Sequence, residues 1–241
     1  VMRGRLIFPI CDRAGTVHGF GARVLTDSVP KYLNSPASPL FHKGRLLYGL
    51  PQAIPAIQQE RQALIVEGYV DVLTLSQAGL RHVVAPMATA LTPEHLSVVR
   101  SLAHRVTLLF DGDRAGHDAT VRALAPVCNA GLHAEVVRLP QGSDPDAYLR
   151  RHGAVAFQDV LSRAVPLSTF VFDTWRTCSN TGTTLRNIVT LVEQVSDSVA
   201  RLTLVHEAEQ QFRLPPGSVM EAAGIGTAAR RQLEDLLCGL F

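Results

Sequence analysis

The sequence predicts an α/β protein with a mainly parallel sheet flanked by helices, and three observations support this fold class. Four short apolar runs lie between residues 63 and 139, and each is apolar almost throughout rather than alternating. Segments with helical periodicity separate these runs. Continuous apolar runs are typical of strands buried on both faces of a parallel sheet, and their alternation with helices is typical of βαβ units. The chain has 241 residues, enough for one large or two small domains with a real core.

The first 50 residues predict a different part, which is antiparallel and basic. Residues 5–10 and 17–24 have the composition of strands, and the turn residues at 12–16 join them into a hairpin. Residues 30–49 contain Asn, Ser and Pro turn signals, with basic residues among aromatic ones. We expect this segment to be an irregular surface loop, and such loops commonly carry function.

From residue 62 onward, strands and helices are expected to alternate. Strands are predicted at residues 63–66, 82–85, 106–110 and 134–139. Helices are predicted between them at residues 70–78, 92–103 and 114–129. The second of these has Thr92 as its N-cap and Pro93 at its first position. No strand signal follows Asp146, and further helices are predicted at residues 146–163, 167–177, 185–195, 197–213 and 228–240, with a polar linker at 177–182.

Composition excludes several classes of protein. With 46% hydrophobic residues and a net charge of +2, the chain is not expected to be disordered. Its longest stretch without a charged residue, 46–59, has 14 residues and is interrupted by Pro51 and Pro55, so no transmembrane helix is expected. The N-terminus has no apolar segment of a secretory signal, which favours a cytoplasmic protein without membrane contact. The four cysteines are scattered, and neither a zinc site nor a disulfide framework is expected.

Charge is distributed unevenly along the chain. Residues 1–50 carry seven basic and two acidic residues, which gives +5 and leaves −3 for the remainder. A basic segment beside an acidic one predicts a surface for polyanions next to a site that handles cations. Of the 23 basic residues, 21 are Arg, and the two lysines are Lys31 and Lys43. Their proximity has two readings: chance, or a requirement for a compact ammonium group that binds phosphate.

Acidic residues directly follow two of the predicted strands. Glu67 follows the run 64–66 and Asp111 follows the run 106–110. Both should therefore lie at the C-terminal edge of the sheet, where ligands of open α/β sheets bind. Asp71 comes four residues after Glu67, and Asp113 comes two residues after Asp111, so the four carboxylates should converge. All-oxygen clusters of this kind suit Mg²⁺ or Mn²⁺ rather than zinc.

Most of the acidic residues also have a simpler interpretation. Asp71 could be only a helix cap, and Asp111 and Asp113 could belong to a turn. The sequence Asp-Pro-Asp at residues 144–146 is that of an ordinary helix start. Glu67 is harder to explain in this way, because a carboxylate that closes a buried strand is costly without a partner.

Taken together, these segments resemble a known family. Residues 67–72, 111–116 and 144–146 resemble the Toprim domain shared by bacterial primases, type IA and type II topoisomerases and some nucleases. Four further segments, residues 5–10, 19–24, 30–36 and 41–50, are similar to the basic part that precedes Toprim in the RNA-polymerase core of bacterial DNA primase. The resemblance covers about residues 3–170. It implies part of a basic α+β lobe for nucleic acid and nucleotides at 1–60, a Toprim-type catalytic domain at 61–150, and a helical-bundle subdomain at 151–241.

The resemblance also implies roles for particular residues. It implies that Glu67, Asp111 and Asp113 bind the catalytic metals. It also implies that Asp71, Asp144 and Asp146 complete the acidic site. It further implies that nucleotide phosphates and template are held at four basic-groove positions, which are Arg23, Lys31, Asn34 and Lys43. Both lysines fall on these basic positions, which favours the phosphate reading of their spacing.

The implied activity is synthesis of short RNA primers on single-stranded DNA by metal-dependent nucleotidyl transfer. The implied cofactor is Mg²⁺, with Mn²⁺ as a substitute, and the substrates are ribonucleoside triphosphates. A zinc ribbon would lie in a region outside this chain. A replicative helicase and a single-strand-binding protein would bind through regions outside it. Two alternatives remain: a truncated, non-catalytic nucleic-acid-binding module, or a Toprim nuclease or topoisomerase-like enzyme.

The sequence departs from the family pattern at three places. Ala22 replaces a glycine before Arg23, and Met87-Ala88 replaces a Leu-Gly type of pair. Both add side chain where the family keeps the backbone bare, and both could shift the nearby loops. Cys11 occupies a position that is often basic, which removes one positive charge from the groove.

Overall fold

The apolar runs of the middle segment form a six-stranded sheet with the predicted mainly parallel pairing. Its four inner strands are parallel and lie in the order β6 (Val83–Pro86), β5 (Gln62–Ile65), β7 (Arg105–Leu108) and β8 (His133–Val136). Two short antiparallel strands complete the edges, β4 (Leu47–Tyr48) beside β6 and β9 (Val165–Pro166) beside β8. The computed structural model describes residues 2–26, 29–36, 38–39, 41–87, 90–178 and 180–225. The helix predicted at 228–240 and the departure at Ala88 lie outside these residues.

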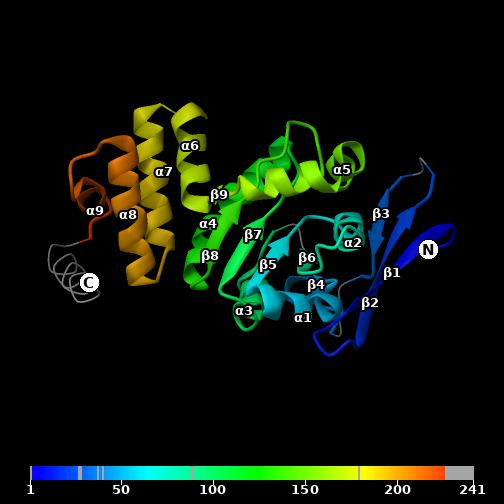
Figure 1. The fold of residues 1–241 in the computed structure, drawn as a ribbon. Coiled ribbons are helices and arrows are strands. Elements are labelled where there is room, and N and C mark those ends of the chain that lie inside the picture. The colour runs from blue at the N-terminus through cyan, green and yellow to red at the C-terminus, as the bar shows by residue number, and fades with distance from the viewer. Residues whose placement is uncertain are drawn as a thin grey trace.

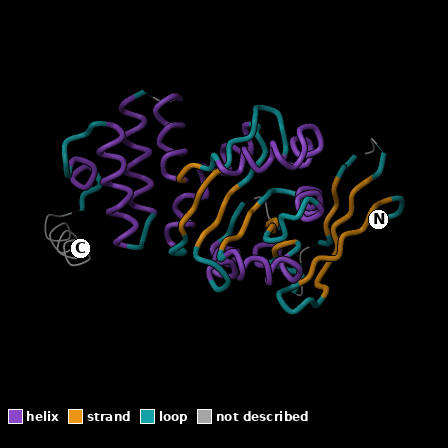
Figure 2. The backbone as a smooth tube through the Cα atoms, viewed as in Figure 1, coloured by secondary structure: helices purple, strands orange, loops and turns teal. Residues whose placement is uncertain are grey.

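Helices cover both faces of this sheet (Figures 1 and 2). Apolar side chains of α1 (Leu50–Glu60), α3 (Pro93–Arg100) and α4 (Arg114–Asn129) share one core cluster with alternate strand residues such as Ile65 and Leu108. Side chains of α2 (Tyr69–Gln77) and α5 (Pro145–Ser162) pack with the strand residues between them, such as Leu64. Burial of both strand faces explains why the strands are apolar throughout.

The N-terminal part forms a separate three-stranded antiparallel sheet, which we call the basic lobe. It consists of β1 (Arg5–Cys11), β2 (Val17–Val24) and β3 (Tyr32–Asn34), and the predicted hairpin is its β1–β2 pair. A small apolar cluster that includes Phe8, Phe41, Tyr69 and Met87 joins this lobe to the large sheet. The lobe lies at the end of the molecule where the sheet ends in β4 (Figure 1).

The C-terminal part is helical, as predicted, and packs beyond β8 at the opposite end of the molecule (Figure 1). It contains α6 (Leu167–Cys178), α7 (Thr181–Gln194), α8 (Ser198–Phe212) and the short α9 (Ser218–Ala222). Their apolar side chains belong to the same core cluster as α1, α3 and α4. Because α6 packs on both α4 and β8, the bundle continues one face of the sheet.

Two expectations about secondary structure are wrong, and one helix was not predicted. A strand does follow Asp146: β9 has only two residues, so it carries no periodic signal. The segment 30–49 is not wholly an irregular surface loop, because it contains β3, a 3₁₀ turn at Lys43–Arg45 and β4, and Phe41 is 1% exposed. The helix that was not predicted is α1, which begins within residues 46–59 and contains both of their prolines. Pro51 lies in the first turn of α1, and α1 continues through Pro55 because Leu50, Ala53 and Ile57 bury one stripe against the sheet.

No helix in the described part of the chain combines the length and the apolar character needed to cross a membrane.

Candidate active site at the C-terminal edge of the sheet

Glu67 and Asp111 meet at the C-terminal edge of the large sheet. They follow β5 and β7, which are neighbouring parallel strands. The backbone N–H of Asp111 donates a hydrogen bond to Oε1 of Glu67, at 3.0 Å. An ideal Cβ on Gly116 would lie 2.7 Å from the same Oε1 and 2.3 Å from the Asp111 carbonyl oxygen. Only a glycine therefore allows α4 to begin so close to both carboxylate-bearing loops.

The loop after β7 is held against the loop after β8. The N–H of Gly112 donates to the carbonyl of Ser143 at 2.8 Å, and the N–H of Gly142 donates to the carbonyl of Gly112 at 2.9 Å. An ideal Cβ on Gly112 would lie 2.3 Å from the carbonyl oxygen of Pro140. This contact brings Asp144, at the end of the second loop, toward Asp111.

Asp113 and Asp144 each cap a helix with one carboxylate oxygen. Oδ1 of Asp113 accepts from the N–H of Gly116 at 2.8 Å and caps α4. Oδ1 of Asp144 accepts from the N–H of Ala147 at 2.6 Å and caps α5. Residues 144–146 therefore do form an ordinary helix start, as the simpler interpretation predicts. A cap uses only one oxygen of the carboxylate, so the Oδ2 atom of each side chain can still act as a ligand.

Asp71 and Asp146 are more fully used by the protein itself. Asp71 is 8% exposed, and its two oxygens accept from the N–H groups of Gly68 and Asp146, at 3.2 and 3.1 Å. Oδ1 of Asp146 accepts from the Thr74 hydroxyl at 2.6 Å and pairs with Arg150 at 2.7 Å. These bonds join the first turns of α2 and α5, so this pair positions the two loops on which Glu67 and Asp144 lie.

Burial, together with neighbouring negative charge, raises the pKa of Glu67, Asp71 and Asp111. Burial raises the pKa of Asp111 to about 7, helped by the nearby negative charges of Glu67, Asp71, Asp144 and Asp113. Burial also raises the pKa of Glu67, with a further contribution from Asp113, although the hydrogen bond from Asp111 opposes it. Burial raises the pKa of Asp71 to about 6, against the hydrogen bond from Asp146.

This carboxylate group fits a divalent cation. Oδ1 of Asp111 is buried and has no hydrogen-bond partner among the described residues, which is costly unless something else binds it. The available donors are all carboxylate oxygens, which Mg²⁺ prefers. Within the described ranges, no three His, Cys, Asp or Glu side chains already converge closely enough to hold an ion. Side chains such as Asp113 would therefore have to turn toward it.

Tyr69 connects the carboxylate edge to the basic lobe. It follows Glu67 by two residues, and its hydroxyl donates to Oδ1 of Asn34 on β3. An ideal Cβ on Gly21 would lie 2.8 Å from the Tyr69 ring, so the ring lies directly on the backbone of β2. Burial raises the Tyr69 pKa to about 12, which keeps the hydroxyl a donor. The sequence analysis missed this role, although Tyr69 lies inside the segment 67–72 that it singled out.

Two of the predicted basic-lobe residues lie near the acidic cluster. The guanidinium of Arg23 lies 5.5 Å from the ring centroid of Tyr32. Burial raises the Tyr32 pKa. The charge of Arg23 opposes this rise, and the charges of Asp71, Asp144 and Asp146 add to it. Oδ1 of Asn34 already accepts a hydrogen bond from the Tyr69 hydroxyl.

The two lysines lie on separate short segments. Lys31 is exposed and precedes β3. Lys43 begins the 3₁₀ turn, and its carbonyl accepts from Nε2 of the buried His95 at 3.0 Å. The hydroxyl of Thr92 donates to the neighbouring carbonyl of Gly44 at 2.5 Å, so the turn is anchored on the start of α3. Among the described residues, neither ammonium group forms an ion pair with the carboxylates of the site.

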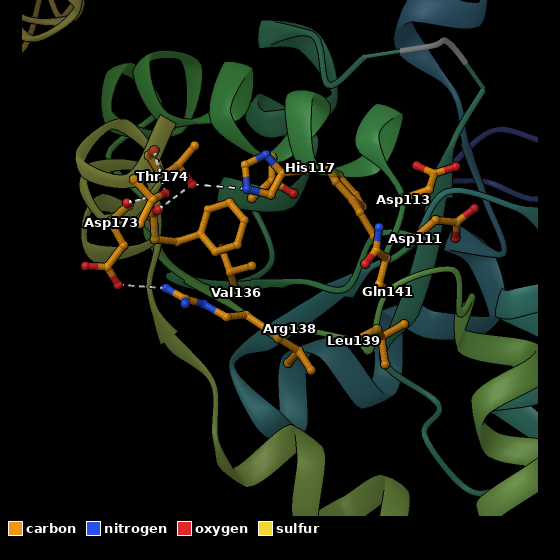
Figure 3. Close-up of a pocket in the computed structure, with 15 residues that line it drawn as sticks. Asp111, Asp113, His117, Val136, Arg138, Leu139, Gln141, Asp173 and Thr174 are labelled. Atoms are coloured by element: carbon orange, nitrogen blue, oxygen red, sulfur yellow. Dashed lines mark hydrogen bonds and ion pairs between the residues drawn. The ribbon is translucent and has the colours of Figure 1, made fainter. Parts of the chain in front are cut away.

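A cavity of about 310 Å³ opens directly beside Asp111 and Asp113. Figure 3 shows these two carboxylates on one side, Asp173 and Thr174 of α6 on the other, and Gln141 between them. We call it the β8–α6 cavity. Its position depends on packing between distant segments, and no local sequence pattern indicated it.

The departures from the family pattern leave the strand pairing in place, although the β1–β2 register shifts between Ile10 and Cys11. Ala22 is fully buried and pairs in register with both β1 and β3. Met87 is 5% exposed and packs in the cluster that joins the lobe to the sheet. Cys11 ends β1 as a partly exposed free thiol.

Comparisons with known proteins agree with this architecture. A family model described as Toprim-like matches residues 64–149, and a model described as DNA primase catalytic core, N-terminal domain, matches residues 1–54. A DNA primase of Halalkalibacterium halodurans is 40% identical over 212 residues, which is 88% of this chain and 35% of the relative. The chain thus spans about a third of the length of that curated relative.

Two solved structures are similar over most of their length. A DNA primase domain from Pseudomonas aeruginosa superposes with a TM-score of 0.82 at 34% identity, covering 92% of this chain and 72% of that one. A DnaG primase catalytic domain bound to single-stranded DNA superposes with a TM-score of 0.75 at 37% identity, covering 88% and 69%.

Proposed function

Because the chain belongs to the family of DnaG-type bacterial DNA primases, we propose that it is the catalytic part of an enzyme that synthesises short RNA primers on single-stranded DNA. The observation that carries the proposal is the acidic group at the edge of the sheet, where the pKa values of Glu67 and Asp111 are raised by burial and by neighbouring negative charge that includes Asp113. We propose a division into an N-terminal part that contains the basic lobe (1–60), the catalytic domain (61–150) and the helical subdomain (151–241). The family models at 1–54 and 64–149 support the first two parts.

Dependence on a divalent metal is general in Toprim primases, and we propose Mg²⁺, with Mn²⁺ as a substitute, as the ion for this chain. Glu67, Asp111 and Asp113 would hold it, because they offer only oxygen ligands and include the unpartnered Oδ1 of Asp111. When bound, the metal would neutralise the triphosphate and favour ionisation of the attacking hydroxyl.

The remaining acidic residues would support the site by holding its loops in place. Asp71 and Asp146 tie the first turns of α2 and α5 together, and Asp144 ends the loop that packs against Gly112. They hold the loops that carry Glu67 and Asp111 in place. Their charge also adds to the negative potential that attracts a cation to the site.

The basic lobe would hold phosphates and template. Arg23, Lys31 and Lys43 supply positive charge, and Asn34 supplies an amide that Tyr69 orients. In the reaction, the 3′ oxygen of one ribonucleotide forms a bond to the α-phosphorus of a second. The bond from that phosphorus to the oxygen bridging to the β-phosphorus breaks, pyrophosphate leaves, and the hydroxyl proton passes to water.

This enzyme would act in the cytoplasm at the replication fork. A replicative helicase and a single-strand-binding protein would contact it through other regions of the full protein, and the zinc ribbon would lie in such a region too. We expect no zinc in this chain.

Changing both Asp111 and Asp113 to Ala in the intact protein tests the metal assignment. Primer synthesis with Mg²⁺ should fall by several orders of magnitude, because the ion loses two of its three ligands. Unaltered synthesis would contradict the assignment. Arg163→Ala is a suitable control, since Arg163 is exposed and pairs with Asp159 on α5.

The chain spans a third of its curated relative, so a second candidate is a module that binds nucleic acid without catalysis. Dinucleotide synthesis by the 241-residue chain alone decides between the two. Formation of the dinucleotide would exclude the non-catalytic module, and binding of single-stranded DNA without any dinucleotide would favour it.

A further inference from the structure

The β8–α6 cavity and the basic lobe lie on opposite sides of the carboxylates. Along the large sheet, the lobe contacts β4 at one edge, and the cavity lies between β8 and α6, toward the other edge (Figure 1). Glu67 and Asp111 follow β5 and β7, between these two positions. The reaction proposed above joins two nucleotides, so it needs a site on each side of the reacting phosphorus.

The lining of the cavity favours a flat, uncharged group over a phosphate. Three planar groups come together: the Phe170 ring, the His117 ring 4.9 Å away, and the Arg138 guanidinium 5.0 Å from the Phe170 centroid. The charge of Arg138 is already matched by Asp173, at 2.9 Å. Because Asp111 and Asp113 add negative charge at the other end, an anion would be repelled.

The polar groups of the lining lie where a heterocycle could meet them. The hydroxyl of Thr174 donates to the carbonyl of Phe170 at 2.9 Å and interacts with Nε2 of His117 at 3.1 Å, which fixes the ring. Figure 3 shows Gln141 between this end of the cavity and the carboxylates. Aromatic faces, an arginine plane and a few fixed polar groups are the usual means by which proteins bind nucleobases.

We propose that the β8–α6 cavity binds the nucleoside part of the ribonucleotide that supplies the attacking 3′-hydroxyl. The base lies against His117 and Arg138, and the ribose lies toward Asp111 and Asp113. The volume of about 310 Å³ is at the lower end for small-molecule pockets, which suits one nucleoside and leaves no room for a duplex. The triphosphate of the second nucleotide lies on the lobe side. This inference rests on the proposed function.

Direct binding of a nucleoside without phosphates tests the site apart from the metal. Adenosine and guanosine are titrated into the 241-residue chain in EDTA, and binding is followed by saturation-transfer NMR on the base protons. The unmodified chain should bind both. Arg138→Ala should weaken binding roughly five- to tenfold, because it removes one planar face. Thr174→Val should weaken it too, since it frees the His117 ring.

Arg163→Ala is the matched control, because Arg163 also belongs to an exposed arginine–aspartate pair, at the C-terminal end of α5, and neither residue of that pair lines the cavity. It should bind nucleoside as the unmodified chain does. Absence of nucleoside binding to the unmodified chain, or equal binding by Arg138→Ala, would overturn the proposal. So would an equal loss in the control.

A second measurement separates this proposal from the proposed function. In dinucleotide synthesis by the intact protein, Arg138→Ala should raise the KM for the nucleotide that supplies the 3′-hydroxyl and leave the KM for the incoming triphosphate unchanged. A rise only in the second KM would overturn the cavity assignment while the primase function stands. The Asp111→Ala, Asp113→Ala double variant should lose synthesis and still bind nucleoside in EDTA. If it instead keeps synthesis, the metal assignment fails and the nucleoside result is unaffected.

Discussion

Replacing Asp111 by Asn should stabilise the metal-free protein while abolishing its response to Mg²⁺. Asp111 is half-buried beside Glu67, and its pKa is raised from the ordinary value of 3.8 to about 7. The folded state therefore retains a proton that the unfolded chain releases between about pH 4 and pH 7. Stability of the unmodified protein should fall as the pH rises through this window and stay low above it.

The size of the effect follows from the shift. A change of about 3 pKa units corresponds to roughly 4 kcal/mol at pH 7.5. Water that still reaches the carboxyl group screens part of this, and the amide hydrogens of Asn need partners of their own, so we expect a net gain of about 2 kcal/mol. For a chain of this length, that is a rise of about 4–8 °C in Tm.

The assay is thermal denaturation from pH 4.5 to 8, first in EDTA and then with Mg²⁺. The unmodified protein should gain Tm from Mg²⁺ above pH 7, because ligand binding stabilises the folded state. Asp111→Asn should start higher, show a flatter pH dependence and gain little. Asp118→Asn is the control, since Asp118 is an exposed residue of α4, the helix that follows Asp111. A variant that is less stable than the unmodified protein in EDTA at pH 7.5, or that keeps the full pH dependence, would refute the reasoning.

Three further variants test other parts of the structure. Gly116→Ala should lose about 1–3 kcal/mol in thermal denaturation, since a Cβ there would collide with the preceding loop, whereas Gly182→Ala, whose nearest neighbour would be 3.7 Å away, should not be destabilised. Equal effects would contradict the close packing. Tyr69→Phe should lower the free energy of unfolding by about 1 kcal/mol, because it removes the bond to Asn34; an unchanged Tm would exclude that bond. Lys31→Ala should reduce the slope of log Kd for single-stranded DNA against log salt by about 0.7, and an unchanged slope would show that Lys31 contacts no phosphate.

Local patterns were sufficient to predict the strand ends and the residues that follow them. Glu67 and Asp111 come directly after buried strands, and parallel pairing of those strands brings them to one edge. The caps of α4 and α5 could also be anticipated, because Asp before a helix has a local preference for that position.

Features that depend on packing between distant segments could not be predicted in this way. The α1 helix tolerates Pro55 only because the sheet buries one of its faces. The contact of Tyr69 with Asn34 joins residues 35 positions apart, and nothing in either segment specifies its partner. The same holds for the β8–α6 cavity, where His117 meets Thr174 across 57 positions.

The central claim is that Glu67, Asp111 and Asp113 hold the catalytic metal, and counting bound Mn²⁺ by electron paramagnetic resonance tests it most directly. The unmodified chain should bind Mn²⁺ at pH 7.5. At about pH 6 it should also release protons as it binds, because Asp111, whose pKa is raised to about 7, must ionise to bind. The triple variant Glu67→Gln, Asp111→Asn, Asp113→Asn should bind none at the same concentration. Equal Mn²⁺ binding by the triple variant would contradict the claim.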